Sequence, residues 1–159
     1  MKPVERFALA THDGPYEAWP ARTAVLVDGL RSGLAVSGYA LLRQFETPAA
    51  YLLVTDYDCP FEEAVTFTLV SKALRKVLAQ RTVGAMYASC HLDALTWADD
   101  RHFSATFVGI DGRWDFTIRD RAVPLIRPRL GMRRVRERHR DDDRGARDGT
   151  DPVRKNVNR

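Results

Sequence analysis

The sequence predicts a mainly β fold: an antiparallel meander that forms a small barrel or sandwich, with one short helix and a disordered basic C-terminal tail. Seven stretches between Val25 and Arg119 alternate apolar with polar residues, which is the period of a strand with one buried face. Short connections rich in turn-forming residues separate these stretches. Neighbours in the chain should therefore pair in space, because parallel strands need a long crossover connection. A half-open sheet wrapped around the short helix is a third arrangement.

Five strands are expected in the first half of the chain, at residues 4–10, 23–30, 33–45, 49–57 and 63–70. Pro15 and Pro20 interrupt any period between the first two strands, so that this segment is expected to be a loop. A tight hairpin at Arg31 and Ser32 would join the second strand to the third, in which Gly38 marks a bend or bulge. The centre of 49–57 is apolar on both faces, which predicts the most buried strand, either covered on both sides or lining a closed interior.

One segment inside the domain has a helical pattern. Ser71 is a suitable N-cap, and Leu74, Val77 and Leu78 follow at the i, i+3, i+4 spacing of an apolar helix face. Gly84 supplies a C-terminal stop. These residues predict a short helix between residues 72 and 83.

Three further strands are expected at residues 87–97, 102–108 and 113–119. Asp111 and Gly112, between the last two, give the strongest hairpin signal in the chain. The last strand divides its side chains between two faces, with Trp114, Phe116 and Ile118 on one and Arg113, Asp115, Thr117 and Arg119 on the other. The aromatic face is expected to lie in the core.

The composition is that of a soluble globular protein with one domain. Of the 159 residues, 45% are hydrophobic and 29% are charged, close to ordinary usage. The N-terminus carries Lys2, Glu5 and Arg6 in place of an apolar signal region, and no stretch has the roughly 18 apolar residues of a membrane span. We therefore expect a cytoplasmic location, no membrane partner, and free thiols at Cys59 and Cys90.

Charge separates a domain at residues 1–130 from a tail at residues 131–159. Residues 121–159 contain thirteen Lys and Arg against six Asp and Glu, a balance of +7, so the first 120 residues carry −3 of the chain's +4. The tail has too few apolar residues to offset the entropy of ordering, which predicts flexibility. Its candidate anion-binding residues are Arg133, Arg134, Arg136, Arg138 and Arg140. They could bind nucleic acid weakly, although the acidic run 141–143 opposes a phosphate backbone.

The densest polar cluster is the acidic turn at residues 56–63, which reads D-Y-D-C-P-F-E-E. The candidate polar site consists of its four carboxylates and one histidine: Asp56, Asp58, Glu62, Glu63 and His91. Oxygen-rich turns of this kind bind Mg²⁺ or Ca²⁺ in other proteins, but a solvated connection between two strands is the simpler interpretation. No metal site is predicted, because His91, Asp93 and His102 lack the spacing of zinc ligands.

These observations favour a non-catalytic domain that binds a protein partner or a small ligand, without a cofactor. The alternatives are a metal-dependent enzyme that uses the acidic turn, and a weak nucleic-acid binder that uses the basic tail. Neither a Walker lysine nor a three-glycine dinucleotide fingerprint accompanies Gly29 and Gly33. The sequence therefore assigns no catalytic residue.

Overall fold

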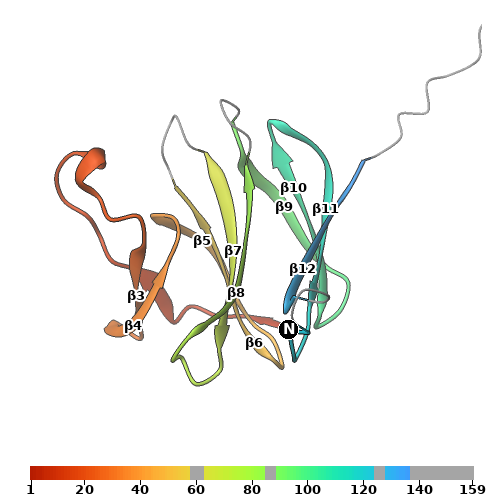
Figure 1. Ribbon diagram of the computed structural model, residues 1–159, viewed down its shortest axis with the longest axis horizontal. Coiled ribbons are helices and arrows are strands. Elements are labelled where there is room, and N and C mark those ends of the chain that lie inside the picture. Colours follow the sequence, from red (N-terminus) through yellow and green to blue (C-terminus); the bar gives the residue numbers. More distant parts are fainter. Residues whose placement is uncertain (58–62, 85–88, 124–127, 137–159) are drawn as a thin grey trace, which may run out of the picture.

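Three antiparallel β-sheets lie in layers in this computed structural model, which describes residues 1–57, 63–84, 89–123 and 128–136 (Figure 1). The strands are β1 (Lys2–Pro3), β2 (Phe7–Leu9), β3 (Thr23–Val27), β4 (Leu30–Val36), β5 (Ala40–Glu46), β6 (Ala50–Asp56), β7 (Ala64–Ser71), β8 (Val77–Gly84), β9 (His91–Trp97), β10 (His102–Val108), β11 (Ile110–Ile118) and β12 (Leu130–Val135). The central sheet has the strand order β1-β5-β6-β7-β8. The N-terminal sheet, β2-β3-β4, packs on one of its faces, and the C-terminal sheet, β12-β11-β10-β9, packs on the other.

The mainly β, antiparallel prediction is confirmed, and the barrel is not closed. All strand pairs in the described residues are antiparallel, and each of the three sheets ends in two edge strands. The only helical element of the described segments is one 3₁₀ turn, Tyr16–Ala18. None of them contains a helix that is long and apolar enough to cross a membrane. The result is a sandwich with a third layer that the sequence did not predict.

The central sheet is buried on both faces because successive residues of its inner strands are apolar. Every residue of β6 is buried. Leu52 and Val54 belong to the core shared with Phe116 of the C-terminal sheet, whereas Tyr51 and Leu53 pack in a second core with the N-terminal sheet. The prediction that 49–57 is the most buried strand, covered on both sides, is thereby confirmed.

The predicted helix after Ser71 is wrong, because this segment is a turn followed by β8. The Ser71 hydroxyl accepts hydrogen bonds from the backbone N–H groups of Arg75 at 3.2 Å and Lys76 at 3.3 Å, much as an N-cap would. The chain turns at Leu74, which has a φ of 54°. β8 then pairs with β7 from Val77 to Gly84. Pairing satisfies the backbone of this segment and overrides the helical spacing of its few apolar residues.

The segment predicted as one strand at 33–45 forms two strands in different sheets. The chain leaves β4 and enters β5 at Gly38, where φ is 99° and a Cβ would lie 2.8 Å from the carbonyl oxygen of Asp56. Only glycine fits this crossing without strain. The preceding hairpin turns at Asp28 and Gly29, which both have positive φ, and not at the predicted position three residues later. An Asp-Gly pair suits this type of turn.

The hairpin predicted at Asp111 and Gly112 is displaced toward the N-terminus. Phe107 pairs with Ile110, so the chain reverses between them. Asp111 and Gly112 lie inside β11, opposite a shift in its register with β10. Gly112 has a φ of 94°, and a glycine with positive φ is as typical of a bulge as of a turn.

β12 lies in the segment predicted as the start of the tail. Leu130 to Val135 pair with Ile118 to Arg113 of β11, and Leu130 is fully buried. Met132 packs against the same core. The ordered domain therefore extends past residue 130, because two alternating apolar side chains are enough to place this strand on an existing core. Residues 137–159 lie outside the described residues, so the flexible tail predicted there stays a prediction.

Candidate functional site

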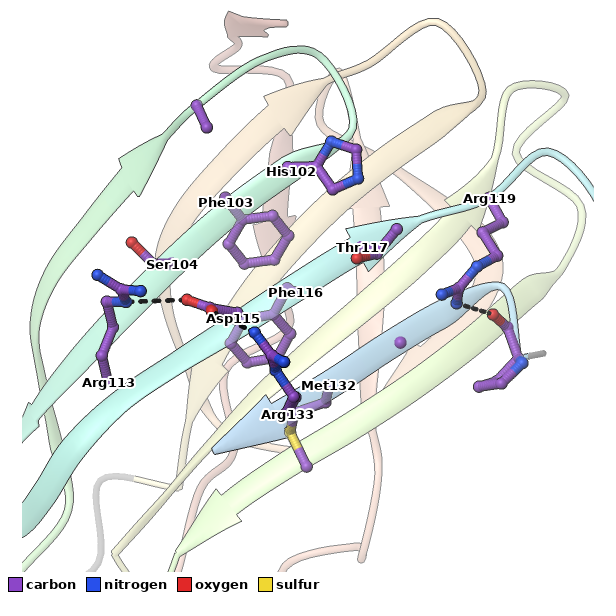
Figure 2. Close-up of a pocket in the computed structure, with 13 residues that line it drawn as sticks. His102, Phe103, Ser104, Arg113, Asp115, Phe116, Thr117, Arg119, Met132 and Arg133 are labelled. Atoms are coloured by element: carbon purple, nitrogen blue, oxygen red, sulfur yellow. Dashed lines mark hydrogen bonds and ion pairs between the residues drawn. The ribbon is translucent and has the colours of Figure 1, made fainter. Parts of the chain in front are cut away.

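A groove of about 690 Å³ lies on the face of the C-terminal sheet that points away from the core (Figure 2). Residues of β10 and β11 alternate between the two faces. Phe103 and Phe116 are buried in the core, whereas Ser104 and Thr117, next to them in the chain, are partly exposed. The groove is thus a product of the alternation that the sequence displays at 113–119.

Strand register arranges the outward positions in two rows that each cross three strands. The first row is Ser104, Asp115 and Arg133, and the second is His102, Thr117 and Gly131. Successive rows lie about 7 Å apart, because a strand rises about 3.4 Å per residue and alternate residues share a face. We call these the Asp115 row and the Thr117 row.

Asp115 joins two arginines in the groove. Its Oδ1 accepts a hydrogen bond from Nε of Arg113 at 2.9 Å, and its Oδ2 lies 3.4 Å from Nη2 of Arg133. The side chain of Arg133 is 79% exposed and that of Arg113 is 49% exposed. Both guanidinium groups are therefore placed over the Asp115 row while most of their N–H donors still face solvent.

Arg119 reaches the groove from the end of β11. Its Nη1 donates to the carbonyl of Pro128 at 2.9 Å, at the start of the segment that leads into β12. A Cβ on Gly131 would lie 2.7 Å from the same nitrogen. The missing side chain at Gly131 thus leaves room for the Arg119 guanidinium to lie across β12, beside the Thr117 row.

The groove has an excess of positive charge. Its lining contains three arginines and one carboxylate, together with the hydroxyl groups of Ser104 and Thr117. His102, also in the lining, is turned toward Asp99, with 2.8 Å between Nδ1 and Oδ2. The backbone N–H of Arg101, and then the His102 side chain, hold the pKa of Asp99 below its usual range. The lowered pKa keeps the Asp99 carboxylate ionised. Asp99 lies beside His102 and is not one of the residues that line the groove.

The residues predicted as a polar site are brought together in part. His91, at the start of β9, lies between two carboxylates: its Nε2 is 3.2 Å from Glu63 Oε2, and its Nδ1 is 3.8 Å from Asp56 Oδ2. Glu63 also accepts a hydrogen bond from the backbone N–H of Cys90 at 3.1 Å. Asp58 and Glu62 lie outside the described residues.

This cluster ties two sheets together. Asp56 ends β6 and Glu63 precedes β7, both in the central sheet, while His91 opens β9 of the C-terminal sheet. An imidazole donates to two carboxylates at once when it is protonated. Among residues 1–57, 63–84, 89–123 and 128–136, no group of three His, Cys, Asp or Glu side chains is arranged to hold a metal ion. What the geometry provides directly is a polar contact between the two layers, with the His91 imidazole placed between Asp56 and Glu63.

The candidate anion-binding arginines have different positions. Arg133 faces the groove, but the Arg134 guanidinium donates to the carbonyl of Asp111 at 2.6 and 3.1 Å and lies 5.8 Å from the Trp114 ring. Arg136 is exposed after the end of β12, whereas Arg138 and Arg140 are outside the described residues. Sequence reasoning missed Arg113 and Arg119 as members of this set. The sequence pattern does place Arg113 and Arg119 on one polar face of their strand. The third arginine, Arg133, joins this face only through the pairing of β12 with β11.

Comparison with known proteins finds no matching family model, no similar curated protein and no similar solved structure.

Proposed function

We propose that this protein is a non-catalytic binding domain whose groove on the C-terminal sheet takes an anionic ligand. The observation that supports this most strongly is that Arg113, Arg119 and Arg133, brought together by the pairing of β11 with β12, line one groove that contains a single carboxylate. A guanidinium group presents its N–H donors as a planar fork that matches carboxylate and phosphate oxygens. The hydroxyls of Ser104 and Thr117 line the same groove and add neutral donors.

The lining residues favour binding over catalysis. His102 pairs with Asp99 in an arrangement that could orient a general base. Among the described contacts, however, no hydrogen bond joins His102 to Ser104, although they are two residues apart on β10. The nucleophile and base that covalent catalysis needs are therefore not paired.

A titration with a polyanion tests the proposal. Poly-L-glutamate should bind at low salt, and poly-L-lysine should not. Because exposed ionic contacts contribute a fraction of a kcal/mol to about 1 kcal/mol each, Arg119→Ala and Arg133→Ala should each weaken binding about threefold or more. Arg31→Ala is the matched control: it removes the same charge from an exposed position on β4 of the N-terminal sheet.

The control variant should bind poly-L-glutamate within about twofold of the parent protein. Equal weakening by all three substitutions would mean that only net charge matters, and the groove would lose its role. Binding that none of the substitutions weakens would place the anion site elsewhere.

A further inference from the structure

We infer that the ligand of the groove is an extended acidic segment of a partner protein, with carboxylates two residues apart. This inference rests on the proposed function and adds to it the class of ligand and the spacing of its charges. It follows from the two-row arrangement of the outward face of the C-terminal sheet, seen in Figure 2.

The positive charges occupy the two rows separately. Arg113 and Arg133 both contact Asp115 and so lie over the first row. Arg119 lies against Gly131, which belongs to the second row with Thr117. Two anionic groups bound by these arginines would therefore be about one row spacing apart, roughly 7 Å.

An extended polypeptide has the same repeat. Its side chains at i and i+2 point to one side and lie about 7 Å apart, whereas those at i and i+1 point to opposite sides. A segment laid along β11 would place one carboxylate on each row. The hydroxyls of Ser104 and Thr117 lie in the floor of the same groove, where they can reach polar groups of the segment.

The arginines have donors to spare for these carboxylates. A guanidinium group has five N–H donors. The bonds from Arg113 and Arg133 to Asp115, and from Arg119 to the Pro128 carbonyl, use one nitrogen on each arginine. These bonds hold the side chains in place, so that less freedom is lost when a ligand binds.

Nucleic acid fits the groove less well than an acidic peptide does. The aromatic residues of the lining, Phe103 and Phe116, are buried in the core and offer no ring on which a base could stack. Asp115, in the middle of the first row, would repel a continuous chain of phosphates. An acidic peptide places a single carboxylate on this row, where Arg113 and Arg133 outnumber Asp115.

A compact small molecule is also a poorer match. Sites for small ligands commonly enclose about 70–90% of the ligand surface. Here the lining includes an Arg133 side chain that is 79% exposed, on the solvent-facing side of a sheet. An open face of this kind suits a segment that gains its contacts along its length.

Two isomeric peptides test the inference. Both are blocked eight-residue peptides of Ser and Thr with two Glu residues, separated by one residue in the first and adjacent in the second. Binding to the full chain is measured by isothermal titration calorimetry at low salt. We expect the first peptide to bind about fivefold tighter than the second, which corresponds to one lost ionic contact of about 1 kcal/mol. Arg119→Ala should abolish this difference, and Arg31→Ala should preserve it.

The other possible outcomes contradict the spacing of the charges, the class of ligand or the proposed function, and each can be told from the others. If both peptides bind equally and both depend on Arg119 and Arg133, the groove binds anions but the spacing inference is wrong. Glutarate binding as tightly as the first peptide would identify a small dianion as the ligand, and a DNA duplex binding more tightly would identify nucleic acid. If none of these probes binds in a manner that depends on Arg119 or Arg133, the proposed function itself is wrong.

Discussion

Cys90 is a residue whose surroundings suppress its chemistry. Its side chain is fully buried, and Sγ lies 3.3 Å from the carbonyl oxygen of Val83. Burial raises the pKa of the thiol, and the neighbouring charges of Asp56 and Glu63 act in the same direction. Because the thiolate is the nucleophile, Cys90 is not a candidate for covalent catalysis.

The raised pKa makes stability depend on pH. In a Cys59→Ser background, the unfolded chain should lose the Cys90 proton near the usual thiol pKa of about 8.5, before the native protein does. The stabilisation is therefore complete below this pH and is lost as pH rises toward the folded-state pKa. We expect urea unfolding midpoints to fall between about pH 8 and pH 10.

A Cys59→Ser, Cys90→Ala variant is the matched control, because it keeps every other titrating group. It should be less stable at pH 7, since a buried side chain is shortened, but its stability should fall less as pH rises. If the two proteins show the same pH dependence, the Cys90 thiol does not supply it.

Residue identities alone were a partial guide to the cluster around His91. Asp56 and Glu63 are close in sequence, so their proximity could be predicted. The contact of His91 with both carboxylates could not be predicted. It depends on the packing of β9 against the ends of β6 and β7, which is a property of the assembled sheets.

At the scale of elements, local pattern and tertiary pairing disagree most clearly in β8. Ser71, Leu74, Val77 and Leu78 have the spacing of a capped helix, yet the cap-like bonds of Ser71 close a turn. The same spacing also fits a turn at Leu74 followed by a strand that begins with Val77 and Leu78. The partner strand β7 decides between them, and nothing within residues 71–84 identifies that partner.

β12 provides a stability test at the element scale. A chain ending at residue 136 keeps Leu130 and Met132 in the core, whereas one ending at residue 129 loses both along with the pairing to β11. We expect the first truncation to leave unfolding free energy within about 1 kcal/mol of the full chain. The second should cost at least about 3 kcal/mol, since removal of one buried leucine side chain alone costs about 2–5 kcal/mol.

Chemical denaturation monitored by tryptophan fluorescence measures both values. The chain ending at residue 136 is the control, because it also lacks the predicted tail. Equal stability of the two truncated proteins would show that β12 contributes little to the fold. Pairing with β11 would then not hold Arg133, the third arginine, in the groove.

At the scale of the whole molecule, the layering explains why one strand pattern was predictable and the architecture was not. The two apolar faces of β6 require cover on both sides, but they do not say which segments supply it. The N-terminal sheet supplies one cover because Gly38 lets the chain cross from β4 to β5. Reading 33–45 as a single strand removes that crossing and with it the third layer.

Net charge was also a poor guide to the site. The first 120 residues carry −3 by sequence, yet two of the three groove arginines, Arg113 and Arg119, belong to them. Their effect comes from convergence with Arg133 on one face and not from the overall balance. Only the register of β11 with β12 reveals this convergence.

The most direct test of the central claim is amide chemical-shift mapping of the ¹⁵N-labelled chain during titration with the peptide that carries two Glu residues separated by one. Binding in the groove predicts that the largest shifts occur at Ser104, Thr117, Gly131 and their neighbours on the C-terminal sheet, whereas Gly29 and Arg31 at the far sheet stay unchanged. Arg119→Ala should reduce the shifts. Saturable shifts confined to the N-terminal sheet or to the surroundings of His91 would contradict the account.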